Sequence, residues 1–294
     1  MIAIVSHDAG GADLLSSWVA ANPGNFCFVL AGPAVDVFRR RLGDIDIIPL
    51  ELAIAQAESL ICSTSWGSDL EWTAIGLANS TGMRTVAVVD HWVNYQERFV
   101  RSPVLHLPDE IWVADPTALR IAAEAFPGLI IVEIENLALA EFVAKVRELS
   151  PVDRAKAGEY RALFLGENLS ANAASTFGDP HHFGYDELSS FRHFIGWLQQ
   201  AGLENPTVRL RPHPSETVAK YLDVLGQVGS ERSRFHVSGT SLAEDVAWSD
   251  GVFGISSMAM VNALAAGRTV YCCIPDPSIE SPLPFDSIIR LSGP

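Results

Sequence analysis

Short apolar runs alternate with helical patterns along the first half of the chain. The apolar runs are IAIVS (2–6), FCFVLAG (26–32), DIIPL (46–50), SLICSTS (59–65), MRTVAVVD (83–90), EIWVAD (110–115) and LIIVEI (129–134). The helical patterns cover 12–21, 34–42, 53–57, 69–80, 117–126 and 137–149. Strands that are apolar on both faces are typical of a parallel sheet covered by helices. The first half is therefore predicted to be an α/β domain.

The same alternation resumes after a polar, proline-marked segment at 150–160, SPVDRAKAGEY, which is the predicted linker. The later apolar runs are ALFLGEN (162–168), TVRLRPHP (207–214), RFHVSG (234–239), GVFGISS (251–257) and RTVYCCI (268–274). Helices are predicted over 186–201, 216–225, 242–248 and 258–266, with a polar loop before the first of them. The pattern predicts two Rossmann-like, doubly wound parallel-sheet domains, residues 1–150 and 151–294, facing each other across a cleft.

Composition narrows the class of protein. The chain has 294 residues, 48% hydrophobic and 19% charged, as in an ordinary globular protein, and a net charge of −15. That charge disfavours a general affinity for nucleic acid, although a local cluster of arginine and histidine still allows anionic small molecules. No apolar run reaches the roughly 18 residues of a membrane span, and the N-terminus lacks a basic leader. We therefore expect a cytoplasmic protein, with peripheral attachment to the inner face of the membrane left open.

The four cysteines, Cys27, Cys62, Cys272 and Cys273, lie in apolar strand-like surroundings and form no C-x-x-C pair. This favours buried reduced thiols over zinc ligands or disulfides.

In sheets of this kind ligands bind beyond the carboxyl ends of the strands, which directs attention to particular loops. In SHDAGGA (6–12), Gly10 and Gly11 are expected to form a tight turn that lets an anion approach a helix N-terminus. His7 and Asp8 would then point into the cleft. The sequence contains no G-x-G-x-x-G and no Walker G-K-[ST], so a standard dinucleotide or ATP phosphate loop is disfavoured. The alternative is a simple turn in which Asp8 caps the helix.

Two further loops of the first half carry polar and aromatic residues. In STSWGSDLEW (63–72), Ser65 is a candidate for the floor of the cleft, and helix capping is the alternative reading of this loop. VVDHWVNYQERF (88–99) places Asp90 and His91 at a strand end. Asp90 or His91 could serve as general base, while aromatic faces and amides suit sugar rings. The expected sugar-binding residues of this loop are Trp92, Asn94, Tyr95 and Arg98. The alternative is a buried aromatic loop with a structural Asp90–Arg98 or Glu97–Arg101 pair.

The second half offers candidates for binding a nucleotide. Glu167 and Asn168 follow its first strand. RLRPHPSE (209–216) carries Arg211, His213 and Glu216, and the two prolines would hold the histidine in place. Ser256 and Ser257 begin a later helix, where hydroxyls and free N–H groups could hold a phosphate, or one serine could simply be its N-cap. The neighbouring His181 and His182 have no third ligand at a suitable spacing, so metal binding is disfavoured.

His213-Pro214 and Ser256-Ser257 resemble, in order and spacing, the two motifs of GT-B glycosyltransferases of the bacterial sialyltransferase, polysialyltransferase and capsule-polysaccharide group. The resemblance implies that His213 lies near the donor phosphate and that the two serines bind phosphate oxygens. The acidic motif that supplies the base in polysialyltransferases is not evident here. The residues themselves nominate Asp90, then Asp8, with His7 and His91 as neighbours. The resemblance also implies closing helices for which the last 20 residues leave little room.

We therefore expect a metal-independent glycosyltransferase, without a cofactor, that moves a sugar from a nucleotide-sugar to a glycan or lipid-linked acceptor. The resemblance implies a CMP-activated acidic sugar and surface-polysaccharide biosynthesis. One alternative is a nucleotide-sugar hydrolase or 2-epimerase of the same fold, and another is a non-catalytic nucleotide-sugar-binding protein. The sequence leaves the oligomeric state open, including a homo-oligomer.

Overall fold

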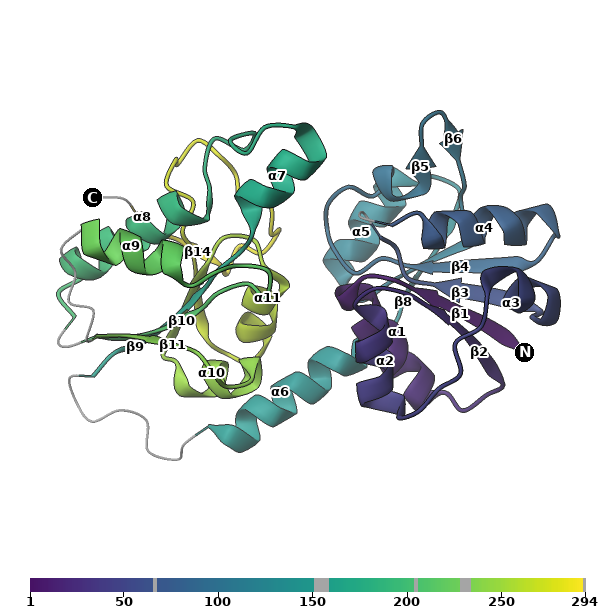
Figure 1. The fold of residues 1–294 in the computed structure, drawn as a ribbon, viewed down its shortest axis with the longest axis horizontal. Helices are drawn as coiled ribbons and strands as arrows, with labels where there is room; N and C mark the ends of the chain where they lie inside the picture. Colours follow the sequence, from purple (N-terminus) through teal and green to yellow (C-terminus); the bar gives the residue numbers. More distant parts are fainter. Residues whose placement is uncertain (66–67, 151–158, 204–205, 228–233, 293–294) are drawn as a thin grey trace. The chain divides into compact units, whose positions relative to one another are not determined.

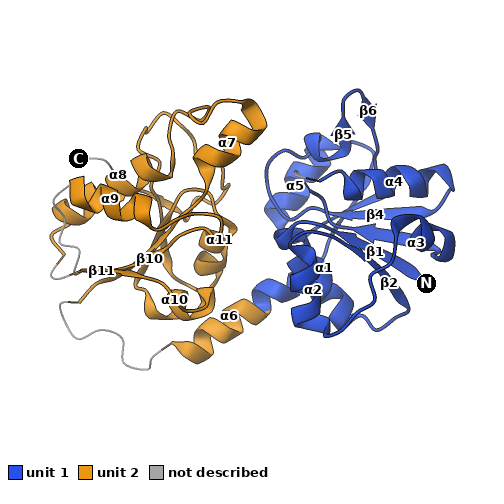
Figure 2. Cartoon of the chain, in the orientation of Figure 1, with its two compact units in different colours: residues 1–140 blue, residues 141–294 orange. Residues whose placement is uncertain are grey.

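A computed structural model describes the chain except for residues 66–67, 151–158, 204–205, 228–233 and 293–294. The chain divides into two compact units, Met1–Ala140 and Glu141–Pro294 (Figure 2). The division lies inside helix α6 (Leu137–Leu149), whereas the sequence placed the boundary after residue 150. Most of the predicted linker, residues 151–158, lies outside the described residues.

Unit 1 is a six-stranded, all-parallel sheet in the order β2-β1-β3-β4-β7-β8 (Figure 1). Its strands are β1 (Ile2–Ser6), β2 (Phe26–Leu30), β3 (Ser59–Cys62), β4 (Arg84–Val88), β7 (Glu110–Val113) and β8 (Ile130–Glu133). Its helices are α1 (Ala9–Ala21), α2 (Ala34–Leu42), α3 (Leu50–Gln56), α4 (Leu70–Ser80) and α5 (Pro116–Ala125). A short 3-10 helix, η1 (Glu97–Phe99), leads into the hairpin of β5 (Val100–Arg101) and β6 (Val104–Leu105). After β1 the chain adds β2 on one side of it and then β3 and the later strands on the other side. The topological switch point therefore lies between β1 and β3.

Unit 2 is also a six-stranded parallel sheet, in the order β11-β10-β9-β12-β13-β14. Its strands are β9 (Arg161–Leu165), β10 (Thr207–Arg211), β11 (Phe235–Val237), β12 (Gly251–Gly254), β13 (Thr269–Cys272) and β14 (Ile289–Arg290). Its helices after α6 are α7 (Leu169–Phe177), α8 (Glu187–Gln200), α9 (Ala219–Gln227), α10 (Leu242–Trp248) and α11 (Met258–Ala265). Numbered along the chain this is the order 3-2-1-4-5-6 of doubly wound dinucleotide-binding domains, with its switch point between β9 and β12.

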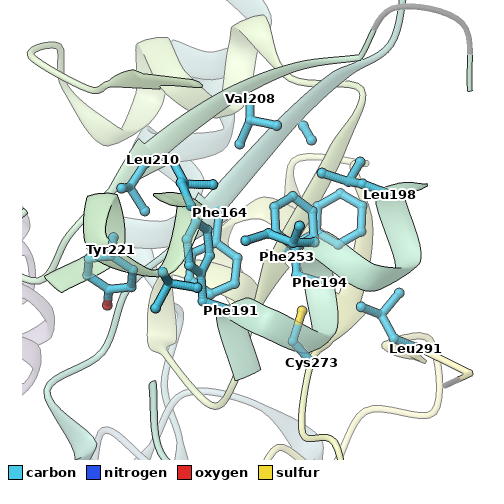
Figure 3. Packing of buried hydrophobic residues seen from close by; sticks show 14 residues of the cluster. Phe164, Phe191, Phe194, Leu198, Val208, Leu210, Tyr221, Phe253, Cys273 and Leu291 are labelled. Carbon is cyan, nitrogen blue, oxygen red and sulfur yellow. The ribbon is translucent and has the colours of Figure 1, made fainter. Parts of the chain in front are cut away.

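Each sheet has its own core, because both faces of its central strands are apolar. In unit 1, Ile4 and Val88 are fully buried with Phe38 of α2 and Leu15 of α1. In unit 2, aromatic rings fill the space between the sheet and helices α8 and α9 (Figure 3). These rings are those of Phe164, Phe191, Phe194, Tyr221 and Phe253. Each buried Phe stabilises the unit by about 1.5–3 kcal/mol relative to an exposed one, so the core is the main reason why these strands stay together.

The prediction of two Rossmann-like parallel-sheet domains is confirmed. The four cysteines are also buried and free, as expected. In the part of the chain that the structure describes, none of the helices combines the length and the apolar character that crossing a membrane would require.

Several predicted elements were wrong. Helix α1 begins at Ala9, so Gly10 and Gly11 lie in its first turn rather than in a tight turn before it. They are small because the helix approaches the sheet closely: a Cβ at Gly11 would lie 2.5 Å from Cβ of Ser63. Residues 46–50 form only one isolated bridge, between Phe28 and Ile47, because Pro49 ends the extended stretch and caps α3.

Three differences concern unit 2. The expected polar loop after Asn168 begins with helix α7. Helix α9 begins at Ala219, so Glu216 precedes it instead of standing in its first turn. The segment after β13, where little room for closing helices was expected and no strand was predicted, adds the two-residue edge strand β14.

Candidate functional site

The candidate residues of unit 1 gather at the switch point of its sheet. His7 and Asp8 follow β1, and Ser63 and Ser65 follow β3, its neighbour in the sheet. Asp90 follows β4, the next strand along. Carboxyl ends of neighbouring parallel strands meet at one edge, so three polar loops that are far apart in the sequence come together there.

His7 and Asp8 form a hydrogen-bonded pair. The Nδ1 atom of His7 lies 2.7 Å from Oδ1 of Asp8, and the hydroxyl of Ser65 donates to Oδ2 of Asp8 at 2.8 Å. An ionised carboxylate only accepts hydrogen bonds, so Nδ1 carries the proton and Nε2 of His7 is left as the proton acceptor. The ring lies against the backbone of Gly32, whose φ of +52° favours glycine and where a Cβ would come within 2.6 Å of Nε2. These contacts hold the imidazole of His7 in one orientation and one tautomer.

Beneath this pair lies Glu71 of helix α4, which the sequence analysis did not single out. Its side chain is buried, with 2% of the residue exposed, and its Oε1 accepts from the backbone N–H of His7 at 2.8 Å and from Oγ of Ser63 at 3.0 Å. The Ser63 hydroxyl also lies 2.8 Å from that of Ser6. Burial raises the pKa of Glu71, and the charge of Asp8 raises it further. The only sequence signal was an acidic residue in the first turn of a helix that follows a polar strand end.

Asp90 is held in an ion pair. Its Oδ1 accepts from Arg98 at 3.2 Å, and the same guanidinium nitrogen donates to Oγ1 of Thr64 at 2.9 Å. Its other oxygen packs against Gly10, where a Cβ would overlap it. Only 14% of the Asp90 side chain and 9% of the Arg98 side chain are exposed. The structural Asp90–Arg98 pair, one of the alternatives considered from the sequence, is therefore present. The Arg101 side chain pairs with Asp69 at 2.6 Å.

The other residues of the 88–99 loop are mostly packed into unit 1. The Nδ1 atom of His91 accepts the backbone N–H of Trp92 at 3.0 Å, and burial lowers the pKa of His91, which favours a neutral ring. Trp92 and Tyr95 are 8% and 4% exposed, and Nε1 of Trp92 donates to Asp115 at 2.9 Å. Their rings therefore present no open face to a sugar within this unit. Asn94 is exposed and has a φ of +59°.

In unit 2, Glu167 occupies the position expected for a phosphate. One carboxylate oxygen accepts the backbone N–H groups of Ile255, Ser256 and Ser257 at 3.1, 2.7 and 2.9 Å, and the other accepts the hydroxyl of Ser256 at 2.8 Å. Ser257 caps helix α11 by accepting from the N–H of Ala259 at 3.1 Å, the alternative considered for the serine pair. Burial raises the pKa of Glu167, while these hydrogen bonds lower it. The N-terminus of α11 is thus already occupied by the protein's own carboxyl group.

The RLRPHPSE turn divides into anchored and exposed residues. Arg211 donates to Asp245 at 2.8 Å and to the carbonyl of Thr240 at 2.7 Å, so it holds β10 to the next loop. The Glu216 side chain is fully buried and accepts the N–H of His213 at 2.9 Å. The ring of His213 is exposed, and its Nδ1 lies 2.7 Å from Oγ of Ser215.

Asn168 lies beside this histidine. Its amide donates to Oγ of Ser215 at 2.9 Å, so the structure brings Asn168, Ser215 and His213 together at the carboxyl ends of β9 and β10.

No group of three or more metal-ligating side chains gathers within the described residues. His182 stacks on Phe177 with 3.7 Å between ring centroids. The sequence has one D-x-D, Asp44-Ile45-Asp46, but it follows the C-terminal end of α2 and so lies at the opposite edge of the sheet from His7.

The fold matches several solved structures at low sequence identity. UDP-GlcNAc 2-epimerase from Methanocaldococcus jannaschii matches with a TM-score of 0.59 and 8% identity over 92% of this chain and 83% of that one. MurG from Acinetobacter baumannii matches with a TM-score of 0.51 and 11% identity over 94% and 78%. HepE from Anabaena, solved with UDP and glucose, matches with a TM-score of 0.54 and 14% identity over 92% and 80%. No protein-family model and no curated protein sequence matches the chain.

At these identities the likeness concerns the fold alone. The chain has the GT-B architecture of two Rossmann-like domains, which glycosyltransferases and a nucleotide-sugar epimerase share.

Proposed function

We propose that this protein is an enzyme that acts on a nucleotide-sugar and transfers the sugar to a hydroxyl acceptor. The observation that carries the proposal is the His7–Asp8 pair, which stands at the switch point of one sheet in a GT-B fold. Ligands of doubly wound sheets bind at such points, and a histidine oriented by a carboxylate is a common general base.

In this mechanism Nε2 of His7 accepts the proton of the acceptor hydroxyl. The acceptor oxygen attacks the anomeric carbon, and the bond from that carbon to the donor phosphate breaks with its electron pair leaving on the nucleotide. Asp8 stabilises the imidazolium that forms, and Ser65 keeps Asp8 in place. This role makes His7 the base and Asp8 its orienting partner, whereas Asp90 is already engaged by Arg98.

In unit 2 we assign the donor phosphates to His213, Ser215 and Asn168. These side chains meet at the carboxyl ends of β9 and β10 and include an exposed imidazole that can donate a proton to the leaving nucleotide. Direct phosphate contacts from the backbone of Ser256 and Ser257 would require the Glu167 carboxylate to leave the helix N-terminus first.

A second candidate function is epimerisation or hydrolysis of the donor. The same His7–Asp8 pair could move a proton at a sugar carbon or activate water, and the M. jannaschii structure of similar fold is a UDP-GlcNAc 2-epimerase. A third candidate is binding of a nucleotide-sugar without turnover.

The test is incubation of the purified protein with CMP-, UDP- and GDP-activated sugars, each with and without a mixture of glycan and lipid-linked acceptors. A transferase releases nucleotide rapidly only when an acceptor is present. Fast acceptor-independent release, or exchange of a sugar C–H with solvent deuterium, would assign the epimerase or hydrolase instead. The CMP-activated acidic sugar implied by the sequence motifs is one arm of this panel.

The catalytic pair is tested in the same assay with His7→Asn and Asp8→Asn. We expect either change to lower kcat about 100-fold or more, because general base catalysis contributes about 10²–10⁴-fold. Asp13→Asn is a matched control, since Asp13 lies in helix α1, shortly after the His7–Asp8 pair, and its half-exposed side chain contacts Arg41. Unchanged rates in both variants would exclude His7 as the base.

A further inference from the structure

Glu71 presents a buried carboxyl group whose second oxygen has no hydrogen-bond partner among the described residues. Its first oxygen accepts two hydrogen bonds, from the N–H of His7 and the hydroxyl of Ser63. A proton on this carboxyl must therefore sit on Oε2. A neutral O–H without a partner costs far less to bury than a charged oxygen without one.

Among the titratable groups around Glu71, Asp8 disfavours its ionisation, whereas the hydrogen bonds from the His7 backbone and from Ser63 lower its pKa. Asp8, after β1, raises the pKa of Glu71 through its negative charge, and the thiol of Cys62, at the end of β3, is buried next to it. The third neighbour is His7, which offers its backbone N–H while its ring is turned to Asp8. Two neighbouring carboxyl groups do not both ionise easily. Of the two, the buried Glu71 is the one whose neutral form is favoured.

We propose that Glu71 is a positioning residue of the His7–Asp8 pair and that it acts as a neutral carboxyl group. Through Oε1 it fixes the backbone of His7 and the hydroxyl chain of Ser63 and Ser6. By remaining uncharged it leaves Asp8 as the single negative charge that orients the imidazole. This inference rests on the proposed role of His7 in catalysis.

The charge state is tested without any substrate. The infrared difference spectrum between the wild-type protein and Glu71→Gln at neutral pH is expected to show the C=O stretch of a neutral carboxyl in the wild type alone. If the variant loses a carboxylate stretch instead, Glu71 is ionised and the inference is overturned. This result stands whether or not any nucleotide-sugar is turned over, so it separates failure of this inference from failure of the proposed function.

The positioning role is tested by activity. Glutamine has the shape of a neutral glutamic acid and keeps an oxygen for His7 and Ser63, so Glu71→Gln should retain turnover within about threefold at neutral pH. Glu71→Ala frees the His7 backbone and should lower kcat about 100-fold, the loss that a displacement of about 1 Å can cause. Glu51→Gln is the control, because Glu51 is exposed and occupies the first turn of α3.

The pH profile distinguishes this role from a merely structural one. This role requires that Glu71 hold its proton at neutral pH and lose it as the pH rises, and burial, which raises its pKa, acts in that direction. The wild-type rate should then fall on the alkaline side, while Glu71→Gln, which cannot ionise, should keep its rate there. Identical alkaline limbs in the two proteins would refute the inference, and this comparison holds even if Glu71→Ala fails to fold.

Discussion

His213 combines an exposed ring with a fixed backbone. Its N–H is held by the buried Glu216, and Nδ1 of its ring lies 2.7 Å from the hydroxyl and 3.3 Å from the backbone nitrogen of Ser215, the next residue but one. Removal of the ring therefore costs little folding energy, but it removes the group that we assign to the leaving phosphate.

For His213→Ala we expect kcat to fall about 100-fold, as for loss of a general acid. The free energy of unfolding should change by no more than about 0.5 kcal/mol, which is usual for surface substitutions. Steady-state kinetics and urea unfolding measure the two effects. His236→Ala serves as control, because His236 is also exposed, on strand β11. A protein that is strongly destabilised but retains its turnover would show that the rigid turn is purely structural.

Individual residues also show where the sequence was insufficient. Glu167 was correctly marked as a residue of a strand end, but its partners at 255–257 lie 88–90 positions away along the chain. No local pattern shows that this carboxylate would occupy the N-terminus of α11. The same is true of Glu71, whose contact with His7 spans 64 positions. The sequence predicts which residues reach the edge of a sheet and leaves their pairing to the tertiary structure.

At the scale of elements, Lys220 ties three helices of unit 2 together. Its Nζ lies 2.5 Å from Oε1 of Glu187 at the start of α8 and 2.5 Å from Oε1 of Glu216 before α9. Glu187 also accepts from the N–H and hydroxyl of Ser170 in α7, at 3.0 and 2.7 Å. The side chains of Glu187 and Glu216 are 3% and 0% exposed, so loss of the lysine leaves two buried carboxylates without their cation.

We expect Lys220→Met to destabilise the protein by about 3–5 kcal/mol, the usual cost of removing one partner of a buried ion pair. Urea unfolding at pH 7 measures this loss. Lys145→Met is the matched control, because Lys145 and Glu148 form an exposed pair at 2.9 Å, worth less than about 1 kcal/mol. Equal losses in the two variants would contradict the role given to the buried cluster.

The same cluster has a definite pH dependence. Burial acts to raise the pKa of Glu187, but the hydrogen bonds from Lys220 and Ser170 outweigh it and hold the pKa below its ordinary value of 4.5. A carboxyl group whose pKa is lower in the folded than in the unfolded state stabilises the folded protein at pH values above its unfolded-state pKa. This stabilisation is lost as the pH falls through the folded-state pKa. The difference in unfolding free energy between the wild type and Lys220→Met should therefore shrink as the pH is lowered below about 4.5.

Elements with a strong apolar pattern were predicted correctly, and the exceptions have physical causes. Residues 46–50 look like a strand, but Pro49 removes an N–H and starts α3. Residues 169–177 look like a loop because they are small and polar, yet they form α7, whose only buried residue is Ala173. The two-residue strands of the β5–β6 hairpin were too short to leave a periodic signal.

For the whole molecule, the alternation of apolar runs and helices predicts the two parallel sheets, but it does not give the order of the strands. The order places β1 beside β3 and β9 beside β12, and so brings the His7 loop to Ser65 and the Glu167 loop to Ser256. The fold class predicts that each sheet has a switch point. Only the observed strand order shows which loops lie at each of them.

The whole molecule carries a net charge of −15, so a nucleotide, itself an anion, gains nothing from the overall field and depends on a local site. A ligand that binds only the folded state at 100 times its Kd adds about 2.7 kcal/mol of stability. For units of about 150 residues that corresponds to an increase in Tm of roughly 5–10 °C. We expect at least one of CMP, CDP, UDP and GDP to produce such an increase, and inorganic phosphate at the same ionic strength to produce a smaller one. Because we expect no metal to bridge the phosphates, EDTA should change neither the Tm increase nor the turnover. Loss of either with EDTA, and its recovery with Mg²⁺, would show that a divalent ion belongs to the donor site.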